Sequence, residues 1–229
     1  MTPPISVIVG VGEGLSASLA RKFTARGMSV VLAARDTKKL ASLVAETGAT
    51  AIKCDVTNAR DVDALFAGLV ASLGGVPEVV VYNAAYRVRG PLVSLDAQEV
   101  KKTLDVTAFG AFLVAQAAVR QMLPLKRGTI LFTGASAGVK GYAQSAPFAM
   151  GKFALRGLAQ SMAREFHPQG IHIAHVVIDG GIRATGREDG GNDNTLHPDA
   201  IADSYLHLID PPKNSWSWEI EVRPWVETF

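Results

Sequence analysis

Short apolar runs rich in β-branched residues alternate along this chain with longer amphipathic stretches. The apolar runs are nearly continuous, which is typical of strands in a parallel sheet covered on both faces. The predicted strands are residues 5–10, 29–34, 49–54, 78–83, 129–133 and 171–178. The predicted helices between them are residues 15–26, 37–46, 59–73, 97–123 and 147–166. This alternation predicts an α/β fold, a single domain over residues 1–229 with a doubly wound parallel sheet and helices on both faces.

The ends of several predicted helices carry residues that favour a start or a stop there. Asn58 and Asp96 each precede a helical pattern, where their side chains can accept hydrogen bonds from free backbone N–H groups. Gly27, Gly48 and Gly74 each follow one, where a left-handed residue commonly ends a helix.

Residues 179–198 form the one long stretch without a regular pattern, and they are rich in Gly, Asn and Asp. A loop of that length is usually a lid or a disordered segment. A further helix at residues 198–209 and a short strand at residues 218–222 are predicted after it.

Composition and charge narrow the classes of partner. The chain is 48% hydrophobic, so it has enough apolar surface to bury a large core. Its formal net charge is only +2 and it has no run of like charges, which argues against a nucleic-acid or anionic-membrane partner. The first residues lack the features of a signal peptide and no apolar run is long enough to span a bilayer, so we expect a cytoplasmic protein. The single cysteine, Cys54, is expected to be a small buried side chain, and the five histidines show no metal-ligand spacing.

The first predicted strand runs directly into a glycine-rich turn at residues 10–15, and a helix follows. Glycines here let the backbone bend sharply and bring its N–H groups close to a pyrophosphate, which the start of the helix also stabilises. A glycine cluster alone is also compatible with an ordinary tight turn, but its place in a βαβ unit favours a Rossmann-type dinucleotide site. The candidate binding residues in the turn are Gly10, Gly12, Gly14 and Leu15.

The end of the second predicted strand indicates which dinucleotide would bind. An acidic residue near this point accepts hydrogen bonds from the ribose hydroxyl of NAD(H). Here Ala34 is neutral and Arg35 follows, so a guanidinium could bind a 2′-phosphate. Two acidic residues argue against a 2′-phosphate here. Glu13 could lie near the same phosphate, and Asp36 could form a surface ion pair with Arg35. We therefore expect NADP(H), with NAD(H) as the alternative.

The order and spacing of further segments resemble the short-chain dehydrogenase/reductase family over essentially the whole chain. The glycine turn of that family has the form TGxxxGxG, and Gly10 and Gly14 match it. Val9 stands in place of the Thr, and Ser16 in place of the last Gly. The other similar segments are Asp55-Val56, Asn83-Ala84-Ala85 and Gly180-Gly181-Ile182.

The resemblance carries expectations about binding and assembly. It implies that Asp55 contacts the adenine amino group and that the backbone near Ile182 holds the nicotinamide carboxamide. Val56 and the segment after the fourth strand are counted with the cofactor-binding residues for the same reason. Family members often pair through two long helices, here residues 97–123 and 147–166, so a homodimer or homotetramer is expected.

The catalytic positions are where this sequence departs from the family. The family carries YxxxK on the helix after the fifth strand and a Ser thirteen residues before the Tyr. Lys152 fits the Lys and is also expected to hold the nicotinamide ribose, but Phe148 stands in place of the Tyr. Ala135 stands in place of the Ser, and Thr107 where the family usually has Asn. Only Lys152 of the four relay residues is kept.

These replacements remove the phenol that supplies a proton and the hydroxyl that orients a carbonyl. Loss of a general acid typically slows a reaction by about 10²–10⁴-fold. Other hydroxyls could substitute, although each is also compatible with a solvated or packed loop residue. The candidates are Tyr142, which we count with the catalytic residues, and Ser136, Tyr86 and Ser145.

Three functions remain open at this point. The first is an NADP(H)-dependent oxidoreductase for a small carbonyl or alcohol substrate, using a substitute acid or a solvent proton. The second is a catalytically inactive dinucleotide-binding protein that acts as a sensor or scaffold. The third is reuse of the nucleotide pocket for chemistry without redox. The substrate stays open, because residues 179–198 would line its pocket.

Overall fold

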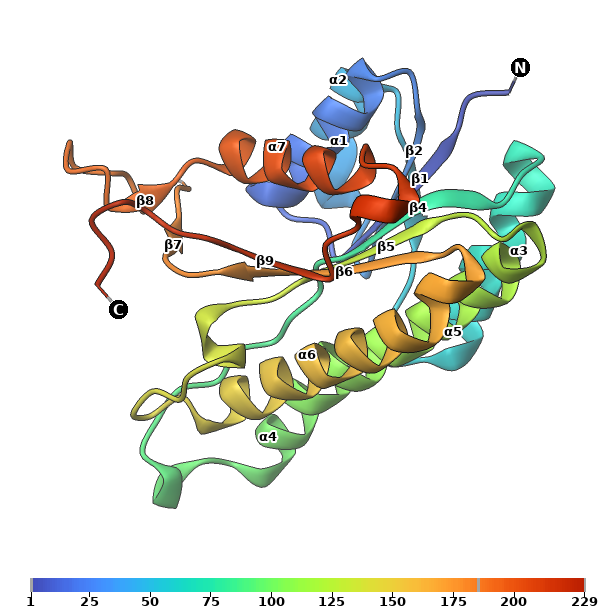
Figure 1. Ribbon diagram of the computed structural model, residues 1–229. Coiled ribbons are helices and arrows are strands. Elements are labelled where there is room, and N and C mark those ends of the chain that lie inside the picture. Colours follow the sequence, from blue (N-terminus) through green and yellow to red (C-terminus); the bar gives the residue numbers. More distant parts are fainter. Residues whose placement is uncertain (1, 185, 229) are drawn as a thin grey trace.

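The computed structural model describes residues 2–184 and 186–228. In this part of the chain, seven parallel strands form one sheet in the order β3-β2-β1-β4-β5-β6-β9 (Figure 1). They are β1 (Ile5–Val9), β2 (Ser29–Ala34), β3 (Thr50–Lys53), β4 (Pro77–Tyr82), β5 (Thr129–Thr133), β6 (His172–Ile178) and β9 (Glu219–Val222). The strand order reverses between β1 and β4, which is the switch point of a doubly wound sheet.

Helices cover both faces of the sheet (Figure 1). One face carries α1 (Leu15–Ala25), α2 (Ala41–Thr47) and α7 (Pro198–Ile209). The other carries α3 (Ala59–Leu73), α5 (Gly110–Met122) and α6 (Ala146–Phe166), with α4 (Ala97–Leu104) packed beside α6. The predicted Rossmann-type α/β fold is confirmed.

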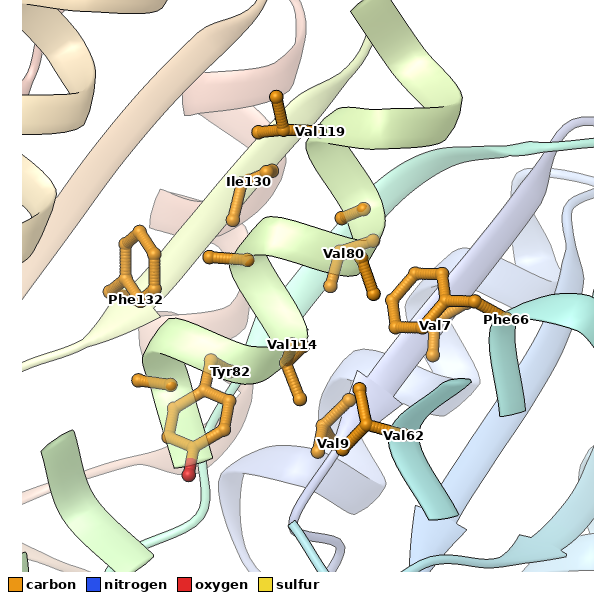
Figure 2. Packing of buried hydrophobic residues seen from close by; sticks show 14 of the residues in the cluster. Val7, Val9, Val62, Phe66, Val80, Tyr82, Val114, Val119, Ile130 and Phe132 are labelled. Atoms are coloured by element: carbon orange, nitrogen blue, oxygen red, sulfur yellow. The ribbon is translucent and has the colours of Figure 1, made fainter. Parts of the chain in front are cut away.

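Alternate residues of each central strand enter the two cores. Val7 and Val9 of β1 pack toward α3 and α5, with Val62 and Phe66 of α3 against them, as Figure 2 shows. Ile8 between them packs on the opposite face. Each fully buried side chain of this size stabilises the fold by about 1.5–3 kcal/mol, so these two layers hold the central strands of the sheet in place.

The predicted helix ends are confirmed. The side chain of Asn58 accepts a hydrogen bond from the Arg60 N–H at the start of α3, and Asp96 accepts two at the start of α4. Gly48 and Gly74 adopt left-handed conformations after α2 and α3. At each of these positions, the helix begins or ends because of a hydrogen bond or a backbone conformation within a few residues of that point.

Two predicted helices are less regular than their patterns indicated. Residues 37–46 begin with a 3-10 turn at Lys38–Leu40, because the Asp36 side chain accepts a hydrogen bond from the Lys38 N–H and tightens the chain. Residues 97–123 contain a π-helical turn at Asp105–Phe109 between α4 and α5. There the carbonyl of Val106 accepts a hydrogen bond from the hydroxyl of Tyr82 in β4. A bond from outside the helix favours such a local widening.

The expectation that residues 179–198 are wholly irregular is wrong. They contain two short parallel strands, β7 (Gly181–Ile182) and β8 (Thr195–Leu196), which pair with each other. Asp189 ties the intervening segment, because its carboxylate lies 2.9 Å from Arg183 Nη2 and accepts a hydrogen bond from the Asn194 N–H. Two-residue strands leave no periodic pattern, so the sequence gives no sign of them.

The helical stretch Ala97–Leu125 is long and apolar enough to cross a bilayer by length and composition alone. Half of its most apolar window is buried inside the fold, where α5 packs against β4 and α3. This burial is typical of the core helix of a globular domain.

Candidate active site

Two neighbouring cavities lie along the carboxyl edge of the sheet, at the switch point between β1 and β4. We call them the adenosine-end cavity, of about 380 Å³, and the reactive-end cavity, of about 520 Å³. Asn83 and Ala85, which follow β4, line both cavities, so the two form one continuous groove. Ligands of open α/β sheets bind at this edge.

The adenosine-end cavity gathers most of the predicted cofactor-binding residues. Those that line it are Gly10, Gly12, Arg35, Asp55, Val56, Asn83, Ala84 and Ala85. Gly14 and Leu15 do not line either cavity. The side chain of Leu15 is buried in the core at the start of α1, so only its backbone is available to a ligand.

Gly10 is fixed in the glycine turn by a close approach of the backbone. Its φ is +85°, and a Cβ there would lie 2.4 Å from the Ala84 backbone. The hydroxyl of Ser16 donates to the carbonyl of Gly10 at 3.1 Å and accepts from Asn83 Nδ2 at 2.7 Å. Ser16 therefore connects the turn to the end of β4, a contact that its place in the motif did not indicate.

Gly12 presents an open side to the same cavity, since a Cβ there would meet no atom within 4 Å. The start of α1 adjoins it, with N–H groups that no helical carbonyl pairs with. This combination of space and free donors suits a pyrophosphate.

Two cations stand beyond β2 at the far end of this cavity. Arg35 and Lys39 both line it, and the sequence did not indicate Lys39 because it lies beyond the strand end, in the 3-10 turn Lys38–Leu40. Asp36 lines the same cavity, where its carboxylate accepts a hydrogen bond from the Lys38 N–H and lies 4.0 Å from Lys39 Nζ. Glu13 lines an adjoining hollow between α1 and α2, which shares Gly12 and Lys39 with this cavity. Among the described residues, neither carboxylate forms an ion pair with Arg35.

Asp55 remains a carboxylate over a wide pH range. Burial raises its pKa, but hydrogen bonds from the backbone and hydroxyl of Thr57 and the charge of Arg35 outweigh it, so the pKa is below its usual value. An ionised carboxylate is a hydrogen-bond acceptor, as binding an amino group requires.

Lys152 lies at the base of the reactive-end cavity. The side chain is 3% exposed, and its Nζ donates to the carbonyl of Thr133, at the end of β5, at 2.6 Å. Burial lowers the pKa of Lys152 to about 8, because the charged form loses its water. The amine is thus held in one place and titrates near neutral pH.

Two cations lie close to the ring of Phe148. Its centroid lies 5.7 Å from Lys152 Nζ and 4.9 Å from Arg87 Cζ. Ala135 lines the same cavity, and so do Ile182 and Ser136. The residues that replace the family's phenol and hydroxyl thus face the cavity, but neither can donate a proton.

Thr107 and Tyr86 lie behind the cavity rather than in its lining. Thr107 is fully buried in the π turn, and its hydroxyl accepts from the Tyr86 N–H at 3.3 Å. The hydroxyl of Tyr86 donates to Glu99 Oε2 at 2.5 Å on α4. Both groups are already engaged, so they support the loop after β4 that borders the cavity.

Two further hydroxyls do line the reactive-end cavity. The side chain of Tyr142 is 43% exposed at its mouth. Ser145, at the start of α6, is 1% exposed, and its hydroxyl has no hydrogen-bond partner among the described residues. An unpaired buried hydroxyl is unusual, and Ser145 therefore keeps a hydrogen-bonding capacity that the described residues do not use.

A buried network supports the end of β5. A Cβ on Gly134 would lie 2.4 Å from His175 Nε2, so the histidine ring packs directly on the backbone before Ala135. Glu219 lies 3.0 Å from the other ring nitrogen and accepts two hydrogen bonds from Arg156. Burial lowers the pKa of His175 to about 4 despite this carboxylate, so the ring is neutral at pH 7.

Comparison with known proteins decides the family. A sequence model of the short chain dehydrogenases matches residues 4–193. The chain belongs to the short-chain dehydrogenase family. The carboxyl-edge groove of this short-chain dehydrogenase fits the nicotinamide dinucleotide that the family binds, through its glycine turn, its cations and Lys152.

Relatives span nearly the whole of this short-chain dehydrogenase. An uncharacterized oxidoreductase of Staphylococcus aureus (strain N315) is 26% identical over 230 residues, covering 98% of both chains. The structure of a short-chain dehydrogenase from Rhodopseudomonas palustris is similar, with 32% identity and a TM-score of 0.85 over 97% of this chain and 99% of that chain. A metagenomic short-chain oxidoreductase in complex with NADP is 30% identical, with a TM-score of 0.84 over 96% of this chain and 97% of that chain.

Three arginines in the reactive-end cavity were not anticipated. Arg87, Arg89 and Arg187 line it together with Lys152. The first two follow β4 and the third follows β7, so a search for motifs along the sequence does not group them. A cluster assembled from distant loops can be recognised only in the folded chain.

Proposed function

We propose that this short-chain dehydrogenase is an NADP(H)-dependent oxidoreductase that interconverts a small carbonyl compound and its alcohol. The observation that carries this proposal is the continuous groove, with Arg35 and Lys39 at one end and the buried amine of Lys152 at the other. A relative with 30% identity over nearly the whole chain was solved with NADP, which supports the same cofactor here.

The choice of NADP(H) rests on charge at the ribose end. A phosphate there would lie near two cations, and charge-assisted hydrogen bonds to a guanidinium are among the strong ones in proteins. Asp36 also lines this cavity, but its carboxylate is bonded to the Lys38 N–H and lies 4.0 Å from Lys39 Nζ, whereas Arg35 has no carboxylate within ion-pair distance among the described residues.

At the reactive end, the bound nicotinamide would supply or accept the hydride. The chain's own residues hold the substrate and provide the proton. Lys152 is fixed on the Thr133 carbonyl, and the hydroxyls of Tyr142 and Ser145 line the cavity. We infer that one of these hydroxyls, or water admitted beside them, gives the proton that the family's phenol supplies. Tyr86 is a weaker candidate because its hydroxyl is bonded to Glu99.

The cofactor assignment can be tested by binding. NADPH and NADH are titrated into the wild-type protein, the Arg35→Ala variant and an Arg60→Ala control, with fluorescence and melting temperature as readouts. We expect wild type to bind NADPH more tightly, and Arg35→Ala to weaken NADPH by about tenfold or more while NADH changes little. Arg60 is an exposed residue of α3 outside both cavities, so its variant should match wild type. Equal losses for both cofactors would contradict the phosphate assignment, and no binding of either would contradict the function.

A catalytically inactive dinucleotide-binding protein is the second candidate. It is favoured by Phe148 and Ala135, which leave the cavity without the family's two hydroxyls. A screen of aldehydes, ketones and quinones with NADPH separates the two candidates when wild type is compared with Phe148→Tyr. Turnover by wild type that Tyr142→Phe or Ser145→Ala removes supports the enzyme. Turnover seen only with Phe148→Tyr supports the inactive relative.

A further inference from the structure

The mouth of the reactive-end cavity carries a concentration of positive charge. Arg87, Arg89 and Arg187 line it, and Lys152 adds a fourth basic group at its base. Burial lowers the pKa of Arg87, and the charges of Arg89 and Arg187 lower it further, so both of these residues act electrostatically on Arg87. We call these three residues the arginine cluster.

The backbone around the cluster is held by defined contacts. The loop after β4 is tied to the chain before α6, because the Gly90 N–H donates to the carbonyl of Gln144 at 3.0 Å. On the other side, Arg187 exchanges two backbone hydrogen bonds with Ala184. A Cβ on Gly181 would lie 3.3 Å from Arg187 Cδ, so the stem of that arginine lies along the turn after β6.

Among the residues that the structure describes, other arginines of the same region have acidic partners, and the cluster has none. Arg183 lies 2.9 Å from Asp189, and Arg223 lies 2.9 Å from Asp179. Within residues 2–184 and 186–228, no carboxylate is within ion-pair distance of the three guanidinium groups of the cluster.

The cavity lining as a whole keeps an excess of positive charge. Its two acidic residues are Asp179 and Glu227, against four basic ones. Asp179 is already paired with Arg223 and also lies 3.5 Å from Lys140 Nζ, both outside the lining. Unpaired like charges repel one another, so gathering them at one opening is unfavourable until an anion arrives.

We propose that the substrate of this enzyme carries an anionic group, a carboxylate or a phosphate, which the arginine cluster binds while the carbonyl faces Lys152. This inference rests on the proposed function and adds the chemical class of its substrate. The cluster lines the cavity that contains Lys152 and Ala135, at the opposite end of the groove from Arg35. The anion it binds is therefore the substrate's own.

The chemistry of the cluster suits such a group. Guanidinium is planar and offers paired N–H donors that match the oxygens of carboxylate and phosphate. The face of Phe148 supports the guanidinium of Arg87 from one side, which leaves its edge donors free for an anion. Phe148, which lacks the hydroxyl of the family's tyrosine, thereby positions Arg87.

A set of para-substituted benzaldehydes with anionic or neutral substituents tests the proposal. NADPH oxidation is followed with para-formylbenzoate, its methyl ester and para-formylphenyl phosphate, using wild type, Arg87→Gln, Arg89→Gln, Arg187→Gln and the control Arg60→Gln. We expect the better of the two anions to exceed the ester in kcat/KM by about tenfold, the effect of one charge-assisted hydrogen bond. The cluster variants should lose this advantage through KM for the anions while their affinity for NADPH stays unchanged, and Arg60→Gln should keep the advantage. The preferred anion distinguishes a carboxylate from a phosphate substrate.

Calorimetry separates this inference from the proposed function. The same three aldehydes are titrated into protein saturated with NADP⁺, so that no turnover is needed. Anion binding that depends on the cluster, without any turnover, supports the anionic site and contradicts the redox function. Equal turnover of anion and ester in every variant contradicts the anionic site and leaves the function standing. Cluster variants that weaken NADPH binding would also overturn the inference, because the arginines would then bind the cofactor.

Discussion

At the scale of single residues, the reactive end is organised around a buried amine and an aromatic ring. Phe148 keeps the size and the π face of the family's tyrosine, and Lys152 and Arg87 both lie near that face. Cation–π contacts of this kind stabilise by about 0.5–2 kcal/mol. The replacement therefore removes a proton donor but retains the packing that keeps Lys152 out of water.

The burial of Lys152 predicts an unusual dependence of stability on pH. Its pKa is about 8 in the folded chain against 10.5 in the unfolded chain, so the unfolded state binds more protons between these values. The free energy of unfolding must then rise with pH in this window. The destabilisation by the buried positive charge of Lys152 is largest below pH 8. Between about pH 7.5 and about pH 9.5, wild type should gain about 2 kcal/mol relative to Lys152→Met.

Urea unfolding of the two proteins without cofactor, over that pH range, measures the difference. Lys213→Met, a change at an exposed lysine, is the matched control and should show no such slope against wild type. A constant difference between wild type and Lys152→Met would mean that the amine is solvated.

At the scale of elements, the turn between β1 and α1 separates structural from ligand-binding glycines. A Cβ on Gly10 would overlap the Ala84 backbone, and its φ of +85° is strained for any other residue. A Cβ on Gly12 would meet nothing but would project where a pyrophosphate is expected to lie.

We therefore expect opposite effects from two small substitutions. Gly10→Ala should destabilise the fold by at least about 2 kcal/mol, because the backbone must move to relieve the overlap. Gly12→Ala should leave the free energy of unfolding within about 0.5 kcal/mol of wild type but weaken NADPH by about tenfold or more. Chemical denaturation and NADPH titration give the two quantities, and tight NADPH binding by Gly12→Ala would argue against a pyrophosphate at this turn.

Short-range chemistry explains how much of the fold the sequence could predict. The strands of the sheet and the ends at Asn58 and Asp96 follow from apolar runs and from capping residues, which act within a few positions. The π turn depends on Tyr82, a residue from a distant strand, and β7 and β8 pair across the twelve residues that separate them. The glycine turn and Lys152 could be placed from motifs, whereas the arginine cluster exists only because two loops converge on one cavity.

At the scale of the whole molecule, two neighbouring helical segments each expose large apolar side chains. Phe109 and Phe112 of the long helical stretch are 50% and 41% exposed, and Met150 and Phe153 of α6 are 50% and 46% exposed. Part of α5 and α6 also borders a shallow groove. Exposed apolar groups on two neighbouring helices are typical of a subunit contact, and we propose that the chain forms a homodimer or homotetramer through this face.

The assembly can be measured by light scattering after size exclusion. Wild type should run as a dimer or tetramer, and the double variant Phe112→Glu/Phe153→Glu should shift toward monomer because charge would be buried at the contact. Val70→Glu, a change at an exposed apolar residue on α3, should leave the mass unchanged. A wild-type monomer at micromolar concentration would refute the proposed contact.

The short ladder between β7 and β8 has a consequence for how this enzyme could change its preferences. The two strands pair with each other and flank the segment that carries Arg187, so both ends of that segment are held close together. Lengthening such a closed loop is inexpensive, at about 0.6 kcal/mol for each doubling. The segment between β7 and β8 can therefore be replaced by another sequence. The replacement would change the shape and charge of the entrance to the reactive-end cavity, while the seven-stranded sheet keeps its stability.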